Sequence, residues 1–145
     1  MYGDTAAGRK RVTQLREQAG DVRALAARLV AQAEAVPWHG KAAEAMRERI
    51  RERAGHLRAV AAQHEVAAES LARHLGEVDT RKDAIATRAR KATSLVEDAR
   101  TRASEATPLA DGSPAPPDGA DAVLLGFDPP PAGHRDWLTV ELPGL

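Results

Sequence analysis

The feature that most constrains the fold is a run of apolar and small residues spaced alternately three and four positions apart. Between about residues 9 and 36 this spacing places them on one face of an α-helix, with arginine and glutamate on the opposite face. A heptad pattern of this kind is typical of helices that pack side by side along a seam. The residues of this first segment that carry the heptad pattern are Val12, Leu15, Ala19, Val22, Ala26, Leu29, Ala33 and Val36.

A second segment with similar spacing extends from about residue 41 to 75. Pro37 disfavours helical geometry at Val36, so the first helix is expected to end there. Because about four residues join the two segments, we expect an all-α fold in which the helices fold back as an antiparallel hairpin. The residues expected to form its core seam, and the surface through which two hairpins pair, are Val12, Leu15, Val22, Leu29, Met46, Ile50, Leu57, Val60, Leu71 and Leu75.

Residues 79–106 carry a third amphipathic pattern. Gly76 stands where a helix C-cap would place it, and Thr80 precedes Asp83 by three residues, as in a capping box. The later apolar positions stay in heptad phase with Leu71 and Leu75, so one long helix is the alternative. We expect a break or bend near residues 76–80, and therefore a third helix or helical extension after a hairpin of residues 9–78. Residues 1–8 are expected to be a flexible N-terminus.

Residues 107–145 differ in composition from the rest of the chain. Eight of the nine prolines lie here, and six acids against one base give this stretch a net charge of −5, so that residues 1–106 carry +5. Such a stretch forms no packed core by itself, and we expect a mostly disordered acidic tail. Apolar residues within it offer possible docking points on another surface, namely Trp137, Leu138, Val140 and Leu142.

The turn between the two helices is expected at Pro37, Trp38 and Gly40. Aromatic residues make up 3% of the chain, and Trp38 is the one aromatic residue of the helical segments. Gly40 provides the backbone freedom for a sharp turn and can cap the following helix. A hairpin leaves its seam open at this end, so Trp38 is expected to close the seam and to present a recognition feature at the tip.

With Trp38-His39-Gly40 at this hinge, about residues 9–78 resemble the WxG-motif proteins, small helical hairpins exported by the bacterial type VII (ESX) secretion system. They are also similar to the secretion-signal domains of polymorphic toxins. The resemblance implies a secreted substrate or escort that forms a four-helix bundle with a second copy or another short hairpin, and that meets a secretion ATPase. The family's export signal, a tyrosine followed four residues later by an acid after the second helix, is absent, because the one tyrosine is Tyr2.

Other function classes have weaker signals. The chain has no cysteine, its histidines lack the spacing of a metal site, and no nucleophile has an identifiable base, so we expect no enzyme, metal or cofactor. The runner-up is a coiled-coil scaffold or adaptor without an export role, whose tail presents a binding segment. Residues 47–58 hold five arginines, but glutamates interleave with them, so a basic nucleic-acid binder ranks third.

The sequence shows neither the apolar core of a secretory signal peptide near its N-terminus nor a run of about 18 apolar residues that could span a membrane. The resemblance to the WxG-motif proteins then implies a protein that is secreted or associated with the cell envelope by a route independent of a signal peptide. The alternative is a cytoplasmic location.

Overall fold

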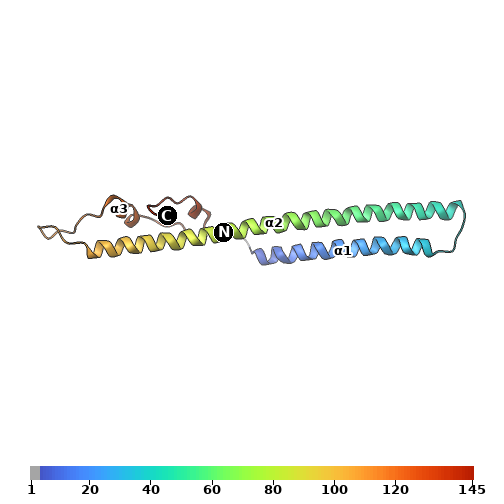
Figure 1. The fold of residues 1–145 in the computed structure, drawn as a ribbon, viewed down its shortest axis with the longest axis horizontal. Helices are drawn as coiled ribbons and strands as arrows, with labels where there is room; N and C mark the ends of the chain where they lie inside the picture. Colours follow the sequence, from blue (N-terminus) through green and yellow to red (C-terminus); the bar gives the residue numbers. More distant parts are fainter. Residues whose placement is uncertain (1–3) are drawn as a thin grey trace. The chain divides into compact units, whose positions relative to one another are not determined.

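The structure is a computed structural model that describes residues 4–145, and within that range it is all-helical with no strand. The order is α1 (Thr5–Ala35), α2 (Lys41–Glu105), α3 (Gly119–Leu125) and a short 3-10 helix, η1 (Arg135–Leu138) (Figure 1). The predicted all-α class is confirmed. Two compact units divide the described chain: residues 4–77, here the helix-pair unit, and residues 78–145, here the C-terminal unit.

Helix α2 passes through residues 76–80 without interruption, so the predicted break there is wrong. A glycine inside a helix costs only about 1 kcal/mol relative to alanine, and no proline follows until residue 108. The heptad phase is also continuous across Gly76. The N-terminal prediction needs correction too, since α1 begins at Thr5, after Asp4 accepts a hydrogen bond of 2.9 Å from the amide of Ala6. Residues 1–3 lie outside the described range.

The helix-pair unit consists of α1 and the first part of α2, which run antiparallel (Figure 1). The direction follows from the contacts, because Arg23 pairs with Glu65 whereas Glu34, later in α1, pairs with Arg51, earlier in α2. Near the start of α1, at the end of the helix pair away from the turn, Val12 packs against Ala68 and Leu75.

The buried core of the helix-pair unit is made mostly of alanine. Seven of its nine buried apolar residues are alanines, and the nine are Val12, Ala19, Ala26, Ala33, Ala43, Ala54, Ala61, Ala68 and Leu75. A methyl side chain lets two helix backbones approach closely, because the distance between helix axes depends on the side chains at the contact. Gly8 extends this close approach, since a Cβ atom there would lie 2.6 Å from Leu75 Cδ2.

This core corrects part of the predicted seam. Of the ten predicted residues, Val12 and Leu75 are buried, while Val60 is 43% exposed and does not belong to the seam. The other seven are half-buried, namely Leu15, Val22, Leu29, Met46, Ile50, Leu57 and Leu71. Alanine occupies the line of closest approach, so longer side chains have room only beside that line. For this reason the sequence pattern of large apolar residues missed Ala54, Ala61 and Ala68.

The C-terminal unit is ordered, which contradicts the prediction of a mostly disordered tail. In this unit the second part of α2 presents Ile85, Ala92 and Ala99 at heptad spacing, and all three are buried. Residues 107–145 fold back along this stripe through α3 and η1 (Figure 1). Trp137 packs against Ile85 and Ala92. A proline-rich segment forms no core by itself, but it can cover a helix that supplies one.

Candidate functional site

The turn between α1 and α2 is held in place by one arginine of α2. Arg47 Nε donates to the carbonyl oxygen of Ala33 (3.2 Å), and its Nη2 donates to the carbonyl oxygens of Val36 and Trp38 (2.8 Å each). The last carbonyl groups of a helix have no partner within the helix, so this side chain satisfies the C-terminal end of α1. Sequence reasoning missed this role, since Arg47 looked like one member of a solvated basic run.

The turn residues themselves adopt the backbone that the sequence predicts. Val36, which precedes Pro37, is extended with ψ of 122°, and Gly40 has φ of +101°, a conformation that favours glycine. The carbonyl oxygen of Gly40 then accepts a hydrogen bond from the amide of Glu44 at 3.1 Å, so α2 starts at once.

Trp38 does not close the seam, and that prediction is wrong. Its side chain is 61% exposed, while the buried residues nearest to it in the chain are Ala33 and Ala43. Arg47, rather than the indole, contacts the end of α1 here. The turn therefore presents a large aromatic side chain to solvent on a backbone that is held by three hydrogen bonds.

Ion pairs between α1 and α2 use some of the arginines that suggested nucleic-acid binding. Arg51 pairs with Glu34 of α1 and with Glu48 at 3.3 Å, and the first of these contacts is the main reason that the pKa of Arg51 is raised. Arg23 likewise forms two hydrogen bonds with the carboxylate of Glu65, one of them 2.8 Å long, and they lower the pKa of Glu65. Solvent screens exposed pairs of this kind, so they align the helices more than they stabilise them.

Three of the four predicted tail-docking residues pack within the C-terminal unit. Trp137 is 5% exposed, its ring meets that of Phe127 edge-to-face at 6.0 Å, and its Nε1 donates to the carbonyl oxygen of Pro131 at 3.1 Å. Val140 and Leu142 pack against the same cluster, whereas Leu138 is 38% exposed and does not.

Two arginines of α2 hold the C-terminal segment. Arg88 Nε donates to the carbonyl oxygen of Trp137 at 2.8 Å, and its Nη2 donates to that of Val140. Arg102 forms two hydrogen bonds with Asp121 of α3, Nε to Oδ2 at 2.9 Å and Nη2 to Oδ1 at 2.7 Å, and this hydrogen-bonded pair lowers the pKa of Asp121. Neither arginine was predicted, because no local pattern links positions so distant in the chain.

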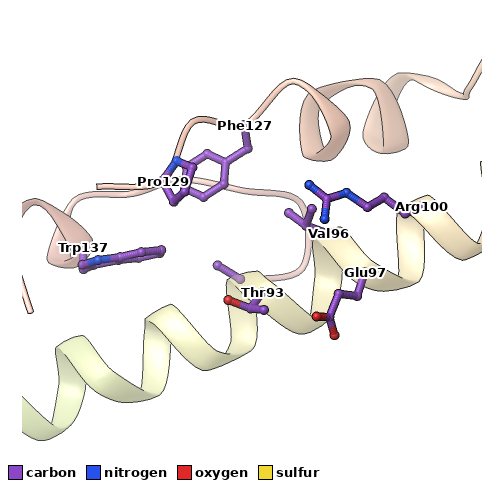
Figure 2. Close-up of a pocket in the computed structure, with 8 residues that line it drawn as sticks. Thr93, Val96, Glu97, Arg100, Phe127, Pro129 and Trp137 are labelled. Carbon is purple, nitrogen blue, oxygen red and sulfur yellow. The ribbon is translucent and has the colours of Figure 1, made fainter. Parts of the chain in front are cut away.

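A cavity of about 200 Å³ lies between α2 and the folded-back segment. Figure 2 shows its labelled residues, with α2 on one side and Phe127, Pro129 and Trp137 on the other. The complete lining is Ala92, Thr93, Val96, Glu97, Arg100, Phe127, Pro129 and Trp137. Apolar walls with two charged residues at one end are a common arrangement in small-ligand sites.

Within residues 4–145 no group of three or more histidine, aspartate or glutamate residues is placed to hold a metal ion. No helix of that range is long and apolar enough to cross a membrane. Comparisons with protein-family models, curated proteins and solved structures find no significant match, so the resemblance to WxG-motif proteins stays a prediction.

Proposed function

We propose that this protein is a non-enzymatic helix-pairing protein of the type VII secretion kind, a secreted substrate or an escort. Its helix-pair unit joins a second copy or another short helical hairpin to form a four-helix bundle. The secretion ATPase binds the pair that is to be exported. The family's export signal is absent from this sequence, whose one tyrosine, Tyr2, lies outside the described residues; either a partner supplies that signal or this copy is not itself recognised for export.

The observation that carries the proposal is the alanine core. Alanine buries little apolar area, and a two-helix layer with seven alanines among nine buried apolar residues has a weak core of its own. Seven large apolar side chains flank that core and stay half-buried, namely Leu15, Val22, Leu29, Met46, Ile50, Leu57 and Leu71. A second pair of helices laid over them would remove their remaining apolar surface from water.

The turn supports a recognition role for Trp38. An exposed indole costs little conformational entropy when it becomes immobilised, and tryptophan is among the residues that most often dominate binding energy at protein interfaces. Trp38 is 61% exposed on a turn whose carbonyl groups Arg47 holds. The partner or the secretion machinery would therefore find this side chain exposed on a backbone that is already held in place.

The alternatives have less support. A scaffold that presents its tail to a partner would have Leu138, which is 38% exposed, to offer there, but Trp137, Val140 and Leu142 pack within the C-terminal unit. A nucleic-acid binder would have the exposed Arg49, Arg53 and Arg58 at its disposal, but Arg47 and Arg51 of the same run are engaged within the helix-pair unit.

Light scattering coupled to gel filtration tests the pairing, alone and with the product of a neighbouring gene that encodes a short helical protein. Leu57→Asn should shift the particle to the mass of one chain, because Leu57 is half-buried beside the seam. The matched control Ala62→Asn, at an exposed position, should leave the mass unchanged. A wild-type protein that is monomeric in every mixture would refute the pairing.

Culture supernatants test the export role. The protein should appear there, disappear when the secretion ATPase gene is deleted, and decrease with Trp38→Ala while helicity measured by circular dichroism stays constant. Retention in the cytosol together with another coiled-coil protein would favour the scaffold instead.

A further inference from the structure

The cavity of the C-terminal unit takes no part in the pairing proposed above. Ala92 and Val96 of α2 contribute apolar side chains to the lining. Phe127, Pro129 and Trp137 line the opposite side (Figure 2). Its volume of about 200 Å³ is larger than the roughly 150 Å³ at which an apolar protein cavity binds benzene. It is smaller than the ~300 Å³ at which pockets for drug-sized ligands begin, so the cavity suits a single ring.

One end of the cavity carries an unpaired cation. Figure 2 shows the guanidinium of Arg100 beside Val96, on the side of α2 that faces the folded-back segment, whereas the carboxylate of Glu97 is directed away from that segment. Arg88 and Arg102 are bound to groups of that segment, but within residues 4–145 Arg100 has neither an ion pair nor a hydrogen bond from its side chain.

The remaining polar group of the lining does not compete with Arg100 for an anion. Thr93 Oγ1 donates its hydrogen to the carbonyl oxygen of Ala89 at 3.0 Å, so it has only acceptor capacity left. An anionic group of a bound molecule would therefore pair with Arg100, whose planar guanidinium matches a carboxylate with two parallel hydrogen bonds.

We propose that this cavity binds a small aromatic monocarboxylate. The ring lies between the apolar wall of α2 and the aromatic pair Phe127 and Trp137, and the carboxylate pairs with Arg100. Aromatic rings favour edge-to-face or offset contacts of the kind that already joins Phe127 and Trp137, so a planar ring fits this wall better than a branched aliphatic group.

The test uses phenylacetate as the probe and the two indole N–H signals in a ¹H–¹⁵N correlation spectrum of the full chain. The Trp137 signal should shift saturably at millimolar phenylacetate, while the signal of the exposed Trp38 serves as an internal reference. Trp38→Phe assigns the two signals. Acetate, which lacks the ring, should produce no shift, and 2-phenylethanol, which lacks the charge, should bind about ten-fold more weakly.

Arg100→Ala should weaken phenylacetate binding by about ten-fold and leave 2-phenylethanol unaffected. Arg90→Ala is the matched control, because Arg90 lies on the same helix and outside the lining, and it should bind phenylacetate like the wild type. The proposal is overturned if Trp137 does not respond, if acetate acts as strongly as phenylacetate, or if Arg100→Ala binds phenylacetate as the wild type does. Unchanged helicity in each variant ensures that lost binding reflects the cavity.

Discussion

Replacing the buried tryptophan of the C-terminal unit should release the segment that follows α2. Trp137→Ala removes a side chain that is 5% exposed, together with the hydrogen bond from its Nε1 to Pro131. Buried tryptophan-to-alanine changes cost about 3–5 kcal/mol, and we expect the lower end because this core is small and can partly collapse.

The assay is native-state hydrogen exchange of the backbone amides. A loss of about 3 kcal/mol is roughly a hundred-fold rise in the open population, so amides around Ile85 and Ala92 should exchange about a hundred-fold faster. Amides of α1 should keep their rates, since α1 belongs to the other compact unit.

Trp38→Ala is the matched control, the same chemical change at a side chain that is 61% exposed. Exposed positions usually change stability by about 0.5 kcal/mol or less, so exchange should hardly change anywhere. Equal effects of the two substitutions, or unchanged exchange in Trp137→Ala, would refute the claim that residues 107–145 are held on α2 by this indole.

Three further predictions concern the contacts that hold each unit. Ala61→Leu should lower the free energy of unfolding by about 1–3 kcal/mol in a denaturant titration, since Ala61 is fully buried in the seam and a larger side chain would overpack it. Arg47→Ala should lower it by about 1–2 kcal/mol and speed exchange of the turn amides, because three carbonyl groups lose a donor. The pairing with Arg102 lowers the pKa of Asp121 in the folded state, so its contribution is present above the unfolded-state pKa of about 4 and is lost as pH falls through the lower folded-state value. Asp121→Asn should therefore flatten the acid side of the pH–stability profile of the C-terminal unit.

Controls and contrary outcomes are specific to each change. Ala62→Leu places the same bulk at an exposed position of α2 and should be nearly neutral, so an equal loss would argue against an alanine seam. Arg49→Ala removes an exposed arginine, and an equal effect at the turn would argue against the role of Arg47. If the stability of the C-terminal unit falls equally at low pH in Asp121→Asn and in the wild type, other carboxylates cause that loss of stability.

The sequence pattern predicted the helical elements well where the signal is local. Pro37 and the glycine at position 40 located the turn, and α1 ends at Ala35 and α2 starts at Lys41. The break at Gly76 was wrong, because a capping-like pattern is weak against an unbroken heptad phase. For the sites, the sequence pattern singled out Trp137, Val140 and Leu142 as apolar tail residues, and the structure packs them against Ile85 and Ala92 of the same chain, a surface that the pattern did not identify.

By itself the sequence determined the helical character of the chain before residue 106 and the position of the turn between α1 and α2, since periodicity, proline and glycine act over a few residues. Only the tertiary structure decided which positions of the heptads are buried, because the distance between two backbones selects alanine over leucine at the line of contact. It also decided the exposure of Trp38 and the order of residues 107–145. Arg47, nine positions after Trp38, holds the carbonyl groups of the turn that exposes the indole. The apolar stripe of α2 gives a proline-rich segment the core that it lacks.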